Sequence, residues 1–343
     1  MNYFLSSMPK ENWANHAGYK ATADVEKIFE KHNLKKFNQN PIFFENKKTI
    51  FGVLFAIMQR ISVSFKLRTL KGHMIFIQYP YPPRRIPDAA VIRAIRRNKA
   101  CLVVHDIASI RNDPARAEKE VFEHAEYIIS HNPKMTEKLL AMTDNSEIIN
   151  LNIFDYLTDN INTCERQKND GIVFAGNLNS IKAGFLYEYG KNSTDFTLNL
   201  YGMYLEEDKI TNDKLQFKGC FDPEELIQKI EGSFGLIWDG NSCTTCSGRY
   251  GEYLRYNNPH KTSLYIIAGL PIIVWSEAAM ADFVLKNNIG IVVDSLIDLP
   301  SVINNITDEQ YNEMHRNVLV LAKSLMNGDI LGNIIDDILS RNN

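Results

Sequence analysis

The amino-acid sequence predicts an α/β protein with two halves, each a Rossmann-like, doubly wound parallel sheet. Short apolar runs alternate with stretches of helical periodicity as far as about position 310, and a helical tail follows. A polar segment without periodicity at 158–170 interrupts this alternation, which then begins again. Alternating strands and helices favour parallel pairing, because two parallel neighbours need a crossover connection between them.

The length and composition are those of an ordinary globular protein. A chain of 343 residues is long for one core, so two domains are expected. Charged residues make up 23% and the net charge is −3, which gives no sign of a nucleic-acid partner. The N-terminus lacks the apolar stretch of a signal peptide, and five scattered cysteines fit a reducing compartment, so we expect a cytoplasmic protein.

The first half, residues 1–157, is expected to form one domain. Its predicted strands are 3–7, 41–44, 73–78, 101–107, 127–131 and 148–154. Its clearest predicted helices are 17–31 and 88–98. Residues 158–170 are predicted to be a linker.

The second half is expected to form a domain over 171–310. Its predicted strands are 171–175, 196–202, 215–219, 234–238, 271–275 and 289–293. Asp222 and Pro223 mark a helix start, since Asp is a favoured N-cap and Pro a favoured first helical residue. The helices of 311–343 would complete the chain and pack back on the first half.

The stretch from 234 to 275 is the most informative. A polar loop at 239–258 ends where Pro259 opens a helix, with apolar strands on either side. A helix N-terminus at the carboxyl end of a parallel sheet favours phosphate. Lys261 would neutralise that phosphate, although it is also explained as a solvated lysine. Thr262 and Ser263 would donate to the same phosphate, or only cap the helix.

Other candidates follow the predicted strands of the second half. Asn177 and Lys182 would reach a diphosphate or a sugar; the alternative is an ordinary turn followed by a surface lysine. Tyr201 would stack on a base, as aromatic rings do, or be a core tyrosine. Tyr250 and Asn258 in the polar loop would bind sugar hydroxyls, or shape the loop.

Two Rossmann-like halves, a linker and a helical tail describe the GT-B architecture of nucleotide-sugar glycosyltransferases. On the fold alone this is an analogy, because such sheets carry many functions. Short sequence motifs spread along nearly the whole chain add to this analogy. Among them are AGYKA (17–21), HDI (105–107), ISHNP (129–133), AGNL (175–178), TCSG (245–248) and NNPHKTSLY (257–265).

In these motifs the chain resembles a small bacterial glycosyltransferase family. That family contains β-1,6-galactofuranosyltransferases of O-antigen synthesis and glucosyltransferases that extend O-linked glycans on streptococcal adhesins. The resemblance implies a UDP-sugar donor, with UDP-galactofuranose favoured, and a lipid-linked or protein-linked glycan acceptor. It also implies inversion at the anomeric carbon and no metal cofactor. UDP-glucose transfer to protein-linked N-acetylglucosamine stays open, as does a non-catalytic nucleotide-sugar-binding subunit.

An inverting transfer needs a general base for the acceptor hydroxyl. His105 and Asp106 follow a predicted buried strand and are the best-placed pair, and Arg111 would orient that carboxylate or bind acceptor. His131, at the end of the next predicted strand, is the second candidate.

The segment before the first predicted helix is a further acceptor-side candidate. Asn15 and His16 would contact the acceptor, and Gly18 would let it approach the backbone. A surface histidine is the plainer explanation of His16.

Two further features have competing explanations. Cys243 and Cys246 have the spacing of half a zinc site, but no second cysteine pair exists, so zinc held by four cysteines is excluded. Residues 49–67 are strongly apolar, with lysines and arginines at their flanks. They would pack as a crossover helix on the sheet, rest on a membrane surface, or form the subunit interface of a homo-oligomer.

Overall fold

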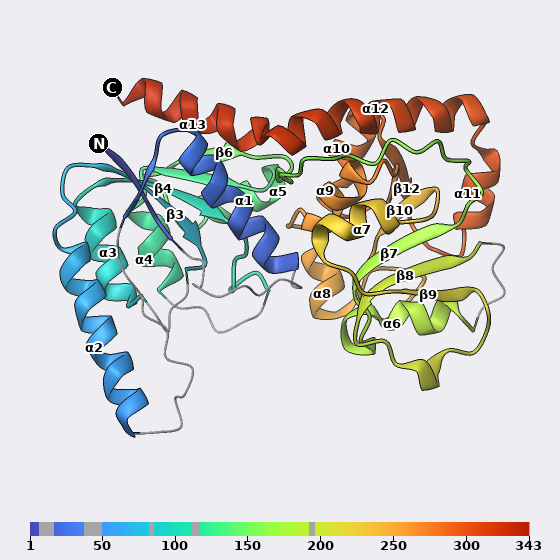
Figure 1. Cartoon of the computed structure of the whole chain (residues 1–343), viewed down its shortest axis with the longest axis horizontal. Helices are drawn as coiled ribbons and strands as arrows, with labels where there is room; N and C mark the ends of the chain where they lie inside the picture. Colours follow the sequence, from blue (N-terminus) through green and yellow to red (C-terminus); the bar gives the residue numbers. More distant parts are fainter. Residues whose placement is uncertain (7–16, 38–49, 82–85, 112–116, 192–195, 343) are drawn as a thin grey trace. The chain divides into compact units, whose positions relative to one another are not determined.

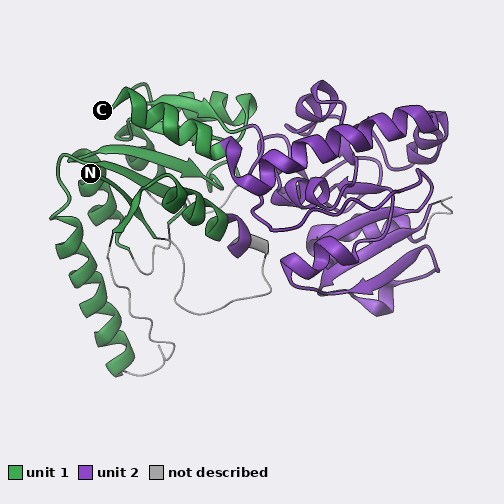
Figure 2. Ribbon diagram, turned by 45° about the horizontal axis from the view of Figure 1, so that its top comes forward, with its two compact units in different colours: residues 1–13, 22–151, 331–343 green, residues 14–21, 152–330 purple. Residues whose placement is uncertain are grey.

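The computed structural model describes residues 1–6, 17–37, 50–81, 86–111, 117–191 and 196–342. The chain divides into two compact units, shown in Figure 2. Unit 1 contains residues 1–13, 22–151 and 331–343, and unit 2 contains residues 14–21 and 152–330. The predicted strand at 41–44 lies outside the described residues.

Unit 1 is built on a parallel sheet of six strands, with the order β2-β1-β3-β4-β5-β6. The strands are β1 (Asn2–Leu5), β2 (Lys35–Phe37), β3 (Met74–Tyr79), β4 (Lys99–Val104), β5 (Tyr127–Ser130) and β6 (Glu147–Asn150). The associated helices are α1 (Ala17–Lys31), α2 (Ile50–Leu67), α3 (Asp88–Arg96), α4 (Glu118–Glu123), α5 (Pro133–Leu140) and α13 (Asp329–Arg341). β3 and β4 are buried along nearly their whole length, as expected for central parallel strands covered on both faces.

Unit 2 has its own parallel sheet of six strands, with the order β12-β11-β10-β7-β8-β9. The strands are β7 (Ile172–Asn177), β8 (Leu198–Met203), β9 (Leu215–Gly219), β10 (Phe234–Ile237), β11 (Ile272–Trp275) and β12 (Gly290–Val293). The helices are α6 (Ser180–Tyr189), α7 (Pro223–Lys229), α8 (Gly248–Tyr253), α9 (His260–Ile267), α10 (Ala281–Lys286), α11 (Leu299–Asn305) and α12 (Asp308–Asn327), with the short 3-10 turn η1 (Glu207–Lys209). Figure 1 shows how these helices flank the sheet.

The predicted fold class is therefore confirmed: the chain holds two α/β units, each with a parallel sheet. Each unit has a separate hydrophobic core. The segment 158–170 forms no helix or strand, but it is held firmly within unit 2. The guanidinium of Arg166 donates to the carbonyl oxygens of Gly232 at 2.7 Å and Ala268 at 2.9 Å.

The helical tail bends at Gly328, whose φ of 78° ends α12 in the left-handed conformation that glycine adopts readily. Most of α13 belongs to unit 1, where His32 Nδ1 lies 2.7 Å from Asp336 Oδ1 and Arg341 donates to Glu147 at 2.7 Å. Within the described residues, no single helix is long and apolar enough to cross a membrane, and only α12 and α13 taken together, bent by 51°, pass such a test.

Candidate functional site

The strand order of unit 2 reverses between β7 and β10. From β7 the chain continues through β8 and β9 on one side, and from β10 through β11 and β12 on the other. Sheets of this kind bind ligands outside the carboxyl ends of the strands, at such a reversal point. The residues found there are Asn177 at the end of β7 and Asp239 just beyond β10.

Lys261 and Asp239 form an ion pair at this reversal point. Lys261 Nζ lies 3.1 Å from Asp239 Oδ1 and 4.4 Å from the centre of the Phe174 ring. The two side chains are only 13% and 8% exposed. Burial lowers the pKa of Lys261, and the Asp239 carboxylate opposes that effect. Because desolvation of two charges is costly, such a pair is weak evidence for stability and better evidence for function.

Lys182 adds a second positive charge to the same region. It lies in the first turn of α6, and its charge contributes to the lowered pKa of Lys261. Lys182 Nζ is 5.6 Å from the centre of the Tyr250 ring. Two lysines and one carboxylate therefore lie in this region, and the surplus positive charge suits an anion. The structure thus brings together Lys182, Tyr250 and Lys261 from the sequence-based candidates.

Glycines hold the polar loop close to this site. Gly240 has a φ of +112°, and a Cβ there would lie 2.4 Å from the carbonyl oxygen of Ser247. The N–H of Gly240 donates to the carbonyl oxygen of Lys182 at 2.8 Å, which joins the loop to α6. Gly176 has a φ of +155° with no atom within 4 Å of its Cβ position, so its backbone borders open space beside Asn177.

The polar residues at the start of α9 have two different roles: some hold the helix in place, and one is available to a ligand. Asn258 donates to the carbonyl oxygen of Asn152 at 2.7 Å, and Ser263 donates to that of Phe154 at 2.6 Å. These two predicted ligand residues are thus buried cross-links that position the helix. Thr262 is different: its Oγ1 is buried without a hydrogen-bond partner in the part of the chain that the structure describes. An unpaired buried hydroxyl next to Lys261 fits the predicted role in anion binding.

Tyr201 and Asn177 occupy contrasting positions. Tyr201 is 1% exposed, and its hydroxyl donates to the Lys229 carbonyl oxygen at 3.1 Å and accepts from the Glu231 N–H at 2.9 Å. A ring buried in this way offers no free face to a base, which argues against the stacking role considered from the sequence. Asn177 is exposed at the end of β7, and its side-chain oxygen accepts the N–H of Asn179 at 2.9 Å.

The carboxyl edge of the unit 1 sheet gathers two histidines. His105 Nε2 lies 2.7 Å from Gln78 Oε1, and His131 Nε2 lies 3.0 Å from the carbonyl oxygen of Val104. Burial lowers the pKa of His105 to about 4. Burial, with a smaller contribution from His105, lowers the pKa of His131 to about 3. Both imidazoles are neutral at physiological pH. His131 is 2% exposed, so its surroundings are those of a structural residue rather than a base.

Asp106 is the accessible carboxylate at this edge. Its Oδ2 lies 2.9 Å from Arg111 Nη1, with the two side chains 39% and 26% exposed. The loop that carries both is held by Glu118, which sequence analysis missed. The Glu118 carboxylate is buried and accepts the N–H groups of Ala108 at 2.6 Å and Ser109 at 3.1 Å. In the sequence Glu118 resembles any acidic residue at a helix start, so no local signal identifies it.

Asn15 and His16 lie outside the described residues. Gly18 lies in the first turn of α1.

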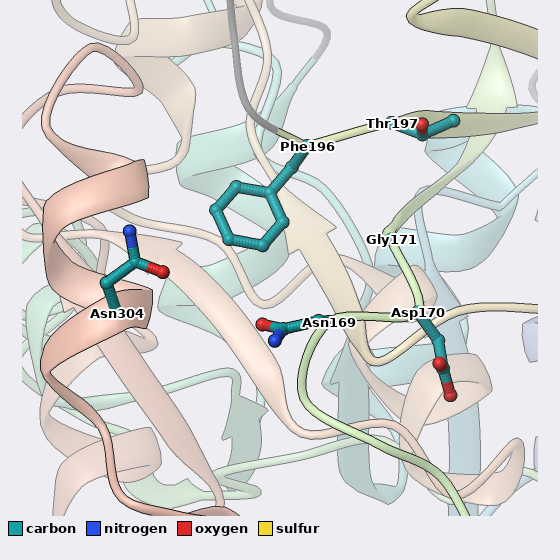
Figure 3. Close-up of a pocket in the computed structure, with 6 residues that line it drawn as sticks. All are labelled: Asn169, Asp170, Gly171, Phe196, Thr197 and Asn304. Carbon is teal, nitrogen blue, oxygen red and sulfur yellow. The ribbon is translucent and has the colours of Figure 1, made fainter.

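A cavity of about 360 Å³ lies elsewhere in unit 2 and is shown in Figure 3. Its lining includes Gly171 and Thr197, which directly precede β7 and β8. It is therefore at the amino ends of these strands, away from the edge where parallel sheets bind ligands.

The two cysteines with zinc-like spacing are buried thiols. Burial raises the pKa of Cys243 to about 12 and raises that of Cys246 as well. Cys243 Sγ donates to the carbonyl oxygen of Phe185 at 3.3 Å. A metal ligand needs the thiolate, which these surroundings disfavour. Among the described residues no group of three His, Cys, Asp or Glu side chains is placed to hold a metal ion.

Solved structures with this arrangement are GT-B glycosyltransferases. HepE of Anabaena, solved in complex with UDP, matches with a TM-score of 0.60 at 12% identity, covering 99% of this chain and 100% of that one. Sucrose-phosphate synthase of Thermosynechococcus elongatus matches with a TM-score of 0.58 at 13% identity, covering 90% and 82%. These likenesses establish the fold. Relatives in sequence that are themselves glycosyltransferases show that the protein is a GT-B glycosyltransferase.

Both halves match models of one family. Residues 2–153 match the glucosyltransferase 3-like N-terminal domain, and residues 172–338 match the glucosyltransferase 3-like C-terminal domain. The β-1,6-galactofuranosyltransferase WbbI of Escherichia coli is 33% identical over 83% of this chain and 88% of its own length. Glucosyltransferase 3 of Streptococcus gordonii is 25% identical over 75% and 76%. The chain belongs to the glucosyltransferase 3-like family, as its sequence motifs predicted.

Proposed function

We propose that this glycosyltransferase moves galactofuranose from UDP-galactofuranose to a lipid-linked glycan in the synthesis of a surface polysaccharide such as O-antigen. The similarity to WbbI over most of both chains carries the choice of sugar. The two lysines at the reversal point of the unit 2 sheet support a diphosphate donor. Five unbonded cysteines support a reducing, cytoplasmic site of action.

Unit 2 holds the donor in this proposal. Lys261 and Lys182 neutralise the diphosphate, and Thr262 donates its hydroxyl to a phosphate oxygen. Negative charge accumulates on the UDP leaving group as the bond to the sugar breaks, so preorganised cations lower the barrier by about 3–4 kcal/mol. These cations take the part that a divalent metal plays in other transferases, and we therefore propose that no metal is needed.

The transfer itself is a single displacement with inversion. The acceptor hydroxyl oxygen attacks the anomeric carbon, the bond from that carbon to the UDP oxygen breaks, and UDP leaves with both bonding electrons. Asp106 takes the hydroxyl proton, and Arg111 orients its carboxylate at 2.9 Å.

A second candidate is UDP-glucose transfer to protein-linked N-acetylglucosamine. It is favoured by the family models, both of which carry the glucosyltransferase 3 name. Since discrimination among hexoses depends on a few hydroxyl contacts, the donor must be decided by assay.

The test is a donor panel with purified protein. UDP-galactofuranose, UDP-galactopyranose, UDP-glucose and UDP-N-acetylglucosamine are each incubated with alkyl glycoside acceptors, with and without EDTA. Galactofuranose transfer that EDTA leaves unchanged is expected. Transfer of glucose alone would replace the first candidate with the second, and loss of transfer in EDTA would refute metal independence. Binding of UDP without transfer from any donor would favour a non-catalytic nucleotide-sugar-binding subunit.

A further inference from the structure

Helix α2 in unit 1 exposes a broad apolar face. Seven large apolar side chains on this helix are between 49% and 83% exposed: Phe51, Val53, Leu54, Ile57, Met58, Ile61 and Phe65. We call this set the α2 face. Positions 51, 54, 58, 61 and 65 recur at intervals of three and four residues, so they share one side of the helix. A contiguous apolar surface of this kind marks an interaction site.

The opposite side of α2 anchors the helix. Val63 is 1% exposed and Leu67 is 2% exposed, and both belong to the unit 1 core. Figure 1 shows α2 running beside α3 in this unit. The α2 face is therefore not a core face left unpacked, because a separate side of the same helix supplies the packing.

Charge distinguishes between possible occupants of the α2 face. Helix α2 contains no Asp or Glu, and it carries Arg60 and Lys66. Arg68 follows directly, with its guanidinium 5.2 Å from the centre of the Phe65 ring. Arg97 then adds a further cation, donating to the carbonyl oxygen of Arg68 at 3.1 Å.

An apolar face beside a band of cations is typical of helices that lie in the surface of an anionic bilayer. A second copy of α2 would instead bring like charges together with no carboxylate on the helix to pair them. The charge pattern therefore favours lipid over self-association.

We propose that the α2 face is the surface by which this enzyme binds an anionic membrane. The apolar side chains enter the boundary between headgroups and acyl chains, and Lys66, Arg68 and Arg97 contact lipid phosphates. This inference rests on the proposed function in one respect: a lipid-linked acceptor gives membrane binding its purpose.

The test is flotation with vesicles of phosphatidylcholine alone or of equal parts of phosphatidylcholine and phosphatidylglycerol. The full chain is compared with the triple variant Phe51→Ser, Met58→Ser, Phe65→Ser. A matched control changes three exposed apolar residues elsewhere, Leu140→Ser, Leu285→Ser and Val320→Ser. A charge variant carries Lys66→Gln, Arg68→Gln and Arg97→Gln. Sedimentation velocity without vesicles gives the oligomeric state of each protein.

The expected result is that the wild-type protein and the control float with the anionic vesicles and that added salt weakens binding. The triple variant is expected to lose at least about tenfold in partitioning. The charge variant is expected to lose roughly fivefold for each cation removed. UDP release with a water-soluble acceptor is expected to be equal in all four proteins, so a failed transferase assay and a failed flotation assay point to different errors.

Three outcomes would overturn the membrane proposal. One is that the wild-type protein fails to float with either vesicle. A second is that the triple variant floats as well as the wild type. A third is a wild-type dimer or larger assembly that the triple variant dissociates while vesicle binding is absent, which would assign the α2 face to an interface between copies of this chain.

Discussion

The carboxyl edges of the two sheets carry opposite kinds of polar chemistry. In unit 2, Lys261 and Asp239 form an ion pair with at most 13% of either side chain exposed. In unit 1, burial leaves His105 and His131 neutral, and the charged pair of Asp106 with Arg111 is more exposed to solvent. The same parallel-sheet architecture therefore supports fixed charge in one unit and neutral donors and acceptors in the other.

The two halves of a transfer reaction account for this difference. A diphosphate leaving group gains negative charge in the transition state, and buried cations stabilise it strongly because water does not screen them. An acceptor hydroxyl is neutral, so a permanent buried cation gains nothing there. It needs hydrogen bonds and one base that keeps contact with water. The predictions that follow test this division from the largest expected effect to the smallest.

Replacing Asp106 tests whether unit 1 supplies the base. Asp106→Asn keeps a hydrogen-bond acceptor for Arg111 but cannot take a proton. We expect kcat to fall by about 10²–10⁴-fold, while UDP affinity measured by calorimetry stays unchanged. Asp144→Asn, at an exposed position in the same unit, is the control. Unchanged turnover in Asp106→Asn would move the proton transfer to another group.

Replacing Lys261 tests whether unit 2 supplies the fixed charge. Lys261→Met should lower turnover by about 10²–10³-fold. It also leaves the Asp239 carboxylate buried without its partner, which is expected to cost about 3–5 kcal/mol of stability.

The double variant Lys261→Met, Asp239→Asn separates the two effects. It should recover thermal stability without recovering turnover, and Lys286→Met, at an exposed position, should change neither. Recovery of both stability and activity in the double variant would show that the ion pair serves the fold alone.

Acid sensitivity tests the neutral histidines. The pKa of His131 falls from its ordinary 6.5 to about 3 in the folded protein, so below pH 6.5 the unfolded chain binds the extra proton and stability falls. For His131 alone the loss near pH 5 is about 2 kcal/mol. His131→Gln should therefore show a shallower decline of the urea midpoint on acidification. Between about pH 7 and 8 the two proteins should respond alike, since the imidazole is neutral in both states there.

Thr262→Val tests the unpaired hydroxyl beside Lys261. Valine has nearly the same shape and no polar atom to satisfy, so stability should hold or rise by up to about 1 kcal/mol. UDP affinity should fall by roughly two- to tenfold if the hydroxyl donates to phosphate, and Thr262→Ser should retain affinity. A Thr262→Val protein that binds UDP as tightly as the wild type would remove this residue from the donor site.

Local sequence predicted most of unit 2, because its signals lie close together in the chain. The break at Asn258 and Pro259 and the apolar run after it placed the start of α9 correctly. The strands at 234–238 and 271–275 agree with β10 and β11 to within one residue at each end. The pairing of Lys261 with Asp239 was not predicted, since it depends on how α9 packs on β10. Gly235 permits that packing: a Cβ there would lie 2.3 Å from the Tyr265 ring.

Burial at strand ends was the part that sequence could not decide. His105, as part of the best-placed pair, and His131, as the second candidate, each follow an apolar run, yet His131 is 2% exposed and His105 is half-buried. Tyr201 failed as a stacking candidate for a related reason. Both faces of a central parallel strand are covered, so the alternation of residues does not reveal which side chain reaches the edge.

The assignment of residues 331–343 to unit 1 bears on synthesis of the chain at the ribosome. The part of α13 that belongs to unit 1, from residue 331 onward, is translated after every residue of unit 2, so unit 1 cannot be completed until the whole of unit 2 has been synthesised. Until then Glu147 and His32 lack their partners on α13. A chain that ends after residue 330 would thus contain all of unit 2 but would lack the last segment of unit 1.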